Sequence, residues 1–281
     1  MDWWLEPFLL GFQQRALVGG LVAGLMSSVV GVWLVLRGMS FFGDAFVHGV
    51  LPGIAAAMIF GFNPYLGAAV AALVMVGGIE LVHRQTALKE DTAIGLLFVG
   101  MMALGVVIIS KSNSYTGSLT SVLFGDIFGV DNATLTTMLG LGIPVLIGSL
   151  LLYRPLLALS FSPAKARTLG MHPRLTHAAL LVLIATAVIA NFQAVGTLLV
   201  FALLVGPPAT AALFTRTVPQ MFVASALLSA VEVWFGLVLS YHLGTAGAAT
   251  LALVAIAVFF LVLAVRPLFR KRAVPKEVAS A

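Results

Sequence analysis

Long apolar runs separated by short polar breaks make up most of the chain. A membrane-spanning helix needs about 20 consecutive, mostly apolar residues, and stretches of that length recur throughout. Between Arg174 and Arg216 there is no Asp, Glu, Lys or Arg, and the polar break NFQAVG divides this stretch into two crossings. The pattern predicts nine spans, at 16–36, 42–60, 64–82, 92–110, 132–153, 175–194, 196–215, 218–241 and 246–265.

The composition strengthens this interpretation. Hydrophobic residues make up 61% of the chain and charged residues 9%, whereas an average soluble domain has roughly 25% charged residues. A soluble core could not bury so much apolar surface, so we expect an all-α fold, a polytopic transmembrane helical bundle of eight or nine spans. The chain contains no cysteine, which excludes disulfides, thiolate metal sites and cysteine nucleophiles.

Two segments outside the spans are also expected to be helical. Residues 1–15 are interpreted as an interfacial N-terminal helix anchored by Trp3, Trp4 and Phe8. Residues 113–130 have both ends on the same side of the membrane in the predicted topology. A short re-entrant helix is expected there, because non-helical backbone at membrane depth must be covered by protein or water.

The basic residues predict the orientation and the domain organisation. With the N-terminus outside, only Arg15 and Lys111 fall outside, and the other predicted loops that carry Lys or Arg are cytoplasmic, as the positive-inside rule requires. The net charge of +5 is therefore attributed to cytoplasmic loops rich in Lys and Arg and not to nucleic-acid binding. Residues 1–265 are interpreted as a single transmembrane domain, and residues 266–281 as a basic cytoplasmic tail.

The stretch FFGDAFVHGVLPG places an aspartate and a histidine four residues apart in an otherwise apolar span. Positions i and i+4 lie on the same face of a helix, so Asp44 and His48 can approach one point. A carboxylate oxygen and an imidazole nitrogen suit a divalent transition metal, and ionisable groups at membrane depth usually face a pathway. Gly49, Pro52 and Gly53 weaken the helix beside them, as in the broken helices of transport sites.

Structural alternatives stay open for this pair. Asp44 could cap the start of a helix, because it follows Gly43 near the cytoplasmic end. His48 could be a buried histidine hydrogen-bonded to a carbonyl group. Two ligands do not fill a coordination shell, so a metal site would need a further ligand from the pathway or the main chain.

Three other polar residues are candidates for the pathway or a gate. Glu232 lies in the middle of span 218–241, where an ionisable residue indicates function by default, although it could pair with a neighbouring helix or a histidine. Asn191 and Gln193 lie at the break between two spans, near the predicted outer surface. They could line a gate or only satisfy the hydrogen bonds of the turn.

The loop 160–173, SFSPAKARTLGMHP, predicts a short, well-delimited cytoplasmic helix. Ser162 is a suitable N-cap and Pro163 fits the first helical position. Gly170 suits a left-handed C-terminal cap. Lys165 and Arg167 give the helix a basic face, which is typical either of an ordinary surface helix or of a rigid docking element for a partner protein.

Motifs of hydrolytic enzymes are absent from the sequence. There is no G-x-x-x-x-G-K-[ST], no H-E-x-x-H and no G-x-S-x-G, so the chain lacks a P-loop, a zincin site and a serine-nucleophile elbow. We therefore expect no catalytic residues, no enzyme activity and no permanently bound cofactor.

Four motifs in order carry a resemblance to a known family. The stretches LRGMSFFGDAFVHGVLPGIAAA, LFGDIFGV, LSFSPAKARTLGMHP and VGTLLVFALLVGPPATA resemble the permease family of manganese, zinc and iron ABC importers, over residues from about 10 to 265. The resemblance implies a homodimeric channel in the cytoplasmic membrane. It also implies cytoplasmic ABC ATPase subunits, which would hydrolyse the ATP, and an extracytoplasmic metal-binding protein that delivers the ion.

The resemblance also implies roles for particular residues. Asp44 and His48 match the paired aspartate and histidine implicated in the metal pathway of the family. The helix at 163–169 matches the coupling helix that docks on the ATPase, and 196–212 matches a pore-lining helix.

Three positions depart from the family pattern. Gly38 follows Arg37 where a second basic residue is expected, and Ser162 stands where an acidic residue is expected. Glu232 matches no position of the pattern.

The sequence as a whole predicts a permease subunit that imports manganese or zinc, with iron as a further candidate, because carboxylate and imidazole ligands accept all three metals. One alternative is a proton-coupled secondary transporter in which Asp44, His48 and Glu232 form a relay. A membrane scaffold without transport is a second alternative. A third is an importer of metal chelates, which would need a wide cavity lined by aromatic residues.

Overall fold

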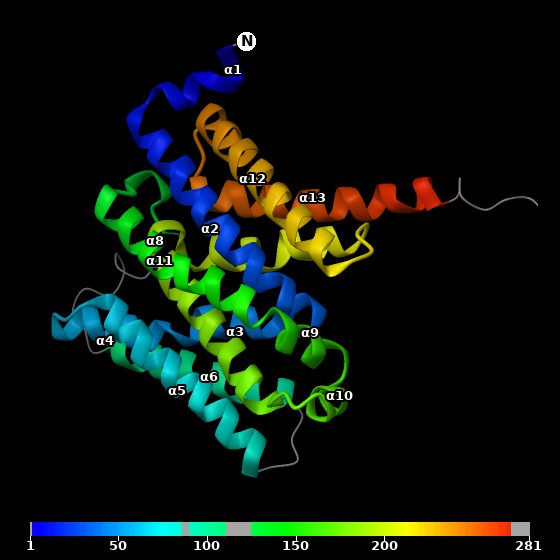
Figure 1. The fold of residues 1–281 in the computed structure, drawn as a ribbon. Helices are drawn as coiled ribbons and strands as arrows, with labels where there is room; N and C mark the ends of the chain where they lie inside the picture. The colour runs from blue at the N-terminus through cyan, green and yellow to red at the C-terminus, as the bar shows by residue number, and fades with distance from the viewer. Residues whose placement is uncertain (1, 86–89, 111–124, 271–281) are drawn as a thin grey trace, which may run out of the picture.

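A computed structural model describes residues 2–85, 90–110 and 125–270 (Figure 1). Within these ranges the chain forms helices and turns, without a β-strand. The elements are α1 (Asp2–Leu5), η1 (Glu6–Leu9), α2 (Gly11–Leu36), α3 (Ser40–Gly49), α4 (Leu51–Phe60), α5 (Pro64–Gln85), α6 (Glu90–Ser110), η2 (Ile127–Gly129), α8 (Asn132–Leu151), α9 (Tyr153–Phe161), α10 (Pro163–Thr168), α11 (Pro173–Ala212), α12 (Val218–Leu243) and α13 (Gly247–Arg270).

The predicted membrane spans are confirmed in the described part of the chain. Nine segments there are long and apolar enough to cross a membrane. Their ends differ from the predicted ends by a few residues at most. They are Gly11–Leu36, Ser40–Phe60, Pro64–Val82, Thr92–Ser110, Asn132–Leu151, Pro173–Phe192, Ala194–Ala212, Val218–Leu243 and Gly247–Arg266.

The helix α11 is the centre of the bundle and packs against α2, α8, α12, α13, α3 and α5. It contains two spans separated by a kink at Gly196, whose φ of 73° and ψ of 165° are not helical. Only glycine adopts this conformation without strain. The predicted break at NFQAVG is thus confirmed at its last residue. The ribbon of α11 changes direction along its length (Figure 1).

Small residues let the central helices approach closely. A Cβ atom added at Gly31 of α2 would collide with the main-chain carbonyl oxygen of Leu204 in α11. One added at Gly24 would meet the hydroxyl of Ser229 in α12. Small residues at such crossings are the usual way in which membrane helices gain packing contacts.

The N-terminal segment differs from the predicted single helix over 1–15. Residues of α1 and η1 form two short helical turns, and Leu10 is extended, with φ of −89° and ψ of 128°. Pro7 supplies no amide proton to the first turn of η1, so a continuous helix is not favoured. Trp3 and Trp4 remain partly exposed, and the ring of Trp3 stacks on His242 of α12 at a centroid distance of 4.2 Å.

The predicted re-entrant helix at 113–130 lies largely outside the described residues. From residue 125 the chain forms the short 3₁₀ turn η2, in which the carboxylate of Asp126 accepts a hydrogen bond from the amide of Gly129 at 3.0 Å. The next helix, α8, is capped by Asp131, which accepts a hydrogen bond from the amide of Thr134 at 2.8 Å. The hydrogen bonds from Thr134 hold the pKa of Asp131 below its usual value.

Two boundaries toward the C-terminal half also differ from the prediction. The span predicted over 132–153 ends at Leu151, and a separate helix, α9, follows. The last helix, α13, continues to Arg270, so the first residues of the predicted tail 266–281 are helical. Residues 271–281 lie outside the described part.

Candidate functional site

The candidate site is built on α3, a short helix that follows a tight turn at the end of α2. Gly38 has a φ of +67° in that turn, a value that favours glycine. The helix ends at Gly49, and α4 begins at Leu51 with Pro52 in its first turn. The predicted weakness of the helix at GVLPG is therefore confirmed as a boundary between two short helices within one span.

Asp44 and His48 lie one turn apart on α3 and face each other. The His48 Nε2 and Asp44 Oδ1 atoms are 3.5 Å apart. The side chains are 27% and 31% exposed, respectively, so the pair is accessible from outside this chain although it belongs to a membrane span. The carboxylate and the imidazole can thus meet at one point, as the sequence predicted.

The geometry also bears on the structural alternatives for these two residues. The N-cap position of α3 is Met39, and Asp44 lies in the second turn of the helix, so Asp44 is not a cap. The His48 Nδ1 atom is buried and has no hydrogen-bond partner among the described residues. The pair alone offers two ligands, and the described part of the chain contains no group of three or more His, Cys, Asp or Glu residues that could enclose an ion.

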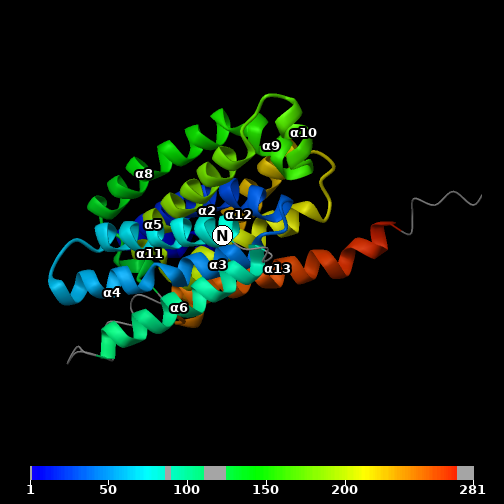
Figure 2. The same ribbon diagram turned by 90° about the horizontal axis from the view of Figure 1, so that it is seen from below.

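Close packing holds α3 and α4 against α5. A Cβ atom at Gly49 would collide with the sulfur of Met75, and one at Gly53 would collide with the main-chain oxygen of Gly67. The ring of His48 also lies 6.2 Å from the ring of Phe98 on α6, and α6 runs alongside α3 (Figure 2). The helix that carries the pair is therefore fixed by its neighbours on α5 and α6.

Asn191 lies in α11, where the first of its two spans ends, and its side chain is enclosed by the bundle. The side chain is 0% exposed. The amide nitrogen donates a hydrogen bond of 3.4 Å to the Ser27 hydroxyl on α2, and Oδ1 has no partner among the described residues. Gln193 belongs to α11, but its side chain lies outside what the structure describes.

Glu232 is buried in the middle of α12, with 1% of its side chain exposed. Neither carboxylate oxygen has a hydrogen-bond partner in the described part of the chain, so the pairing with a histidine that the sequence left open is not observed there. The helix α12 packs mainly against α2, α13 and α11, whereas α3 packs mainly against α6 and α11. The fold therefore does not bring Glu232 together with Asp44 and His48.

The predicted cytoplasmic helix is present as α10, at Pro163–Thr168. The backbone carbonyl of Ser162 accepts a hydrogen bond from Ala166, as expected for the residue that precedes the helix. Gly170 has a φ of +72°, and hydrogen bonds from Gly170 to Arg167 and from Met171 to Ala166 form a Schellman motif. The helix is thus delimited at both ends by the residues that the sequence indicated.

A basic pocket adjoins α10 and contains side chains that the sequence analysis did not connect. It has a volume of about 510 Å³ and is lined by Arg167, His172, Pro173, Arg174 and Leu175. The positive lining suits an acidic group of a partner. The side chains of Pro163 and Lys165 lie outside the described part.

One contact at this end of the bundle was missed from the sequence. The Arg37 guanidinium donates a hydrogen bond to His177 Nδ1, with 2.7 Å between the nitrogen atoms. This contact joins the end of α2 to the first turns of α11, and thus lies between the loop that carries α10 and the turn that leads into α3. The residues are far apart in sequence and belong to no local motif, so only the fold reveals the pair.

Comparisons with known proteins agree with this architecture. A family model described as the ABC 3 transport family matches residues 10–266. The manganese import system permease protein ScaB of Streptococcus parasanguinis is 38% identical over 89% of this chain and 89% of its own. The chelated iron transport system membrane protein YfeD of Yersinia pestis is 34% identical over 92% of this chain and 86% of its own.

A solved structure shows the same arrangement of helices. It is that of PsaBC from Streptococcus pneumoniae in complex with Fab, which superposes with a TM-score of 0.82 at 32% identity and covers 92% of this chain and 94% of the matched chain. The family match spans nearly the whole described bundle, including α3 and α10. The chain belongs to the ABC 3 transport family.

Proposed function

We propose that the chain is the membrane permease subunit of an ATP-driven importer that moves a divalent transition metal ion across the cytoplasmic membrane. The observation that carries the proposal is the Asp44–His48 pair, whose carboxylate and imidazole face each other at 3.5 Å inside a membrane span. Transition metals favour such mixed oxygen and nitrogen ligands. Ionisable side chains are otherwise costly at this depth.

The partly exposed pair would bind the ion transiently along the pathway. Two ligands from one chain form an incomplete shell, which suits an ion that must also leave. A second copy of the permease would complete the shell in a homodimer, because the pair is open to the outside of this chain. Asn191, Gln193 and Glu232 would act away from this pair, as parts of a gate or of the helix contacts that move with it.

Partners on both sides of the membrane would drive and feed the pathway. Cytoplasmic ABC ATPase subunits would dock on α10 and on the basic pocket beside it, through Arg167 and Arg174. An extracytoplasmic metal-binding protein would deliver the ion. In this arrangement the N-terminus lies outside and the C-terminal end of α13 lies in the cytoplasm, which keeps most basic residues inside.

The transported metal is proposed from the relatives and from the ligand chemistry. The name of the Streptococcus parasanguinis relative refers to manganese import, and that of the Yersinia pestis relative refers to chelated iron. Carboxylate and imidazole bind manganese, zinc and iron, with higher intrinsic affinity for zinc than for manganese. We propose manganese as the first candidate, followed by iron and zinc.

The alternative of a proton-coupled secondary transporter is disfavoured. Membership of an ABC transport family supports transport that is powered by ATP hydrolysis. The relay proposed for that alternative would also need Glu232 close to Asp44 and His48, whereas α12, which carries Glu232, does not pack substantially against α3.

The test is metal uptake into vesicles that contain the permease, its ATPase and its binding protein. The substitution Asp44→Asn removes the charge and a metal ligand without changing side-chain size. We expect ATP-dependent uptake of radioactive manganese to fall roughly tenfold or more, as loss of weaker partners of metal sites lowers affinity 10- to 100-fold. Assembly with the ATPase, measured by size-exclusion chromatography, should not change.

The matched control is Asp131→Asn, which makes the same chemical change at the cap of α8. Asparagine is also a good N-cap, so uptake by this variant should equal that of the wild type. Equal uptake by the Asp44→Asn variant would disprove the site. Uptake that ignores ATP and follows a proton gradient would disprove the ABC mechanism.

A further inference from the structure

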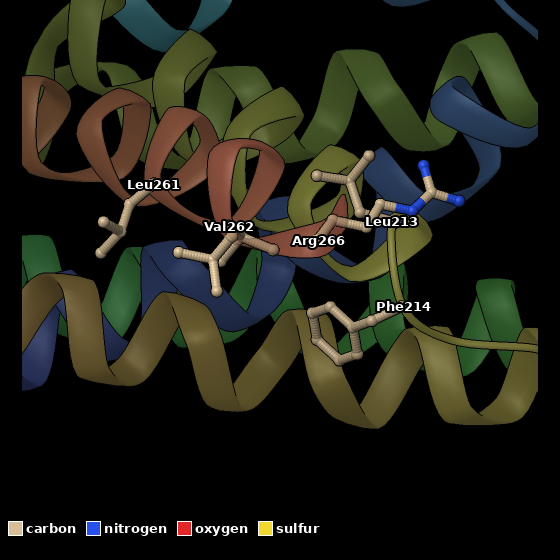
Figure 3. A pocket seen from close by; sticks show the side chains of 6 residues that line it. Leu213, Phe214, Leu261, Val262 and Arg266 are labelled. Atoms are coloured by element: carbon tan, nitrogen blue, oxygen red, sulfur yellow. The ribbon is translucent and has the colours of Figure 1, made fainter. Parts of the chain in front are cut away.

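An apolar pocket lies beside the C-terminal part of α13 (Figure 3), and neither Asp44 nor His48 is among its lining residues. It has a volume of about 430 Å³, within the usual range for small-molecule sites. Leu213 and Phe214 just after α11, with Leu261, Val262 and Val265 of α13, form its apolar walls, and Arg266 is the one charged lining residue among the side chains that the structure describes. Figure 3 shows Leu261 at one end of the pocket and the Arg266 side chain passing Leu213 at the other.

The pocket lies next to the ends of two membrane-spanning segments. The span of α11 ends at Ala212, and that of α13 ends at Arg266. Phe214 and Leu261 are 54% and 63% exposed, so the groove opens toward the surroundings of the bundle. An apolar wall that runs into a cation at this depth matches the order of acyl chain and headgroup in a phospholipid.

The charges around the pocket favour an anionic occupant. Arg266 has no hydrogen-bond or ion-pair partner in the described part of the chain. Arg216 follows the wall residue Phe214 by two positions and is also exposed. Basic pockets between membrane helices on the cytoplasmic side are typical sites for anionic headgroups.

A second copy of this chain fits the pocket less well. In the proposed topology the cytoplasmic side carries the acidic residues Asp44, Glu80, Glu90 and Asp91 before the C-terminal tail, and Lys and Arg outnumber them there. A copy docked on the groove would bury Arg266 against a surface that is mainly basic. A buried cation without an anionic partner is unfavourable, and a lipid phosphate supplies that partner.

We propose that the groove formed by Leu213, Phe214, Leu261, Val262, Val265 and Arg266 is a binding site for an anionic phospholipid. One acyl chain lies along α13, and the phosphate group pairs with Arg266. The site is separate from the metal pathway and does not depend on which metal is transported.

The test is native mass spectrometry of the complete transporter complex after removal of lipid. Phosphatidylglycerol and phosphatidylcholine with identical acyl chains are added in parallel. We expect tighter retention of phosphatidylglycerol by the wild type, and roughly fivefold weaker retention by Arg266→Gln, since one juxtamembrane cation contributes about that factor. Arg154→Gln, an exposed arginine on α9 outside the groove, is the matched control and should behave as the wild type.

A second variant probes the apolar wall. Leu261→Trp places a larger side chain at an exposed position of the groove, so the fold should be retained while both lipids are lost. The proposal is overturned if the two lipids bind equally to the wild type, or if Arg266→Gln and Arg154→Gln behave alike. It is also overturned if Leu261→Trp leaves lipid retention unchanged and separates the two permeases, which would assign the groove to a second copy of the chain.

Discussion

At the scale of single residues, ionisable side chains at membrane depth occur in two contrasting settings. Asp44 and His48 are partly exposed and face each other across one helical turn, which leaves their ligand atoms available. Glu232 is fully enclosed, and its carboxylate oxygens have no partner in the described part of the chain. The first setting suits passage of an ion, and the second suits a structural or gating role within the contact of α12 with α2.

Replacing Glu232 by glutamine tests this contrast. The amide has nearly the same shape and cannot ionise, so it removes any need to bury a charge without a partner. We expect Glu232→Gln to leave the thermal unfolding temperature of the purified permease unchanged or raised. The substitution Glu232→Lys should lower it strongly, because a buried ammonium group has no counter-charge nearby. A strong loss of stability in Glu232→Gln would contradict this and would indicate a partner for the carboxylate.

At the scale of elements, the short helix α10 is defined by local interactions. Its end is fixed by the left-handed conformation of Gly170 and the Schellman hydrogen bonds. The helix and the residues after it present Arg167 and Arg174 to a pocket of about 510 Å³. A helix with a fixed end and a basic pocket beside it suits the proposed role, in which the ATPase binds α10 and moves it as a rigid body.

Charge reversal in this element tests the proposed docking. In Arg167→Glu an acidic group of the ATPase would meet a like charge, and like charges across an interface can weaken binding by several kcal/mol. We expect at least a tenfold loss in the amount of ATPase that co-purifies. Arg154→Glu makes the same change on α9, outside the pocket, and should retain the ATPase. Equal losses in both variants would mean that the overall basic charge matters and the pocket does not.

At the scale of the whole molecule, the two loops that flank α12 must lie on opposite sides of the membrane, because α12 spans it once. The proposed topology places the loop with Arg216 inside and the loop with Ala246 outside. Basic residues are concentrated on the side of Arg216, as the positive-inside rule requires. Because successive spans alternate in direction, finding the side of these two loops would determine the orientation of the entire bundle.

The absence of cysteine allows a direct test of this topology. Single substitutions Ala246→Cys and Arg216→Cys introduce unique labelling sites at exposed positions. A membrane-impermeant maleimide applied to intact cells should label the Ala246→Cys variant only, and the Arg216→Cys variant should react after permeabilisation. The reverse pattern would invert the proposed orientation, and with it the assignment of α10 to the cytoplasm.

The sequence by itself determined the features that depend on local chemistry. The spans follow from runs of apolar residues, since a bilayer imposes a fixed length on every crossing. The helix α10 follows from Pro163 and Gly170, and the proximity of Asp44 to His48 follows from their spacing of four residues on one helix. The nine spans and the position of α10 were therefore predicted to within a few residues.

Only the tertiary structure decided features that depend on helices distant in sequence. It separated Glu232 from the Asp44–His48 pair, and it joined Arg37 to His177 across the bundle. It also showed that the Asn191 side chain is buried and donates a hydrogen bond to Ser27 of α2. In a membrane nearly every helix is apolar on all sides, so hydrophobic periodicity does not reveal which face meets which neighbour. Close packing of small residues makes that choice, and it becomes visible only in the assembled fold.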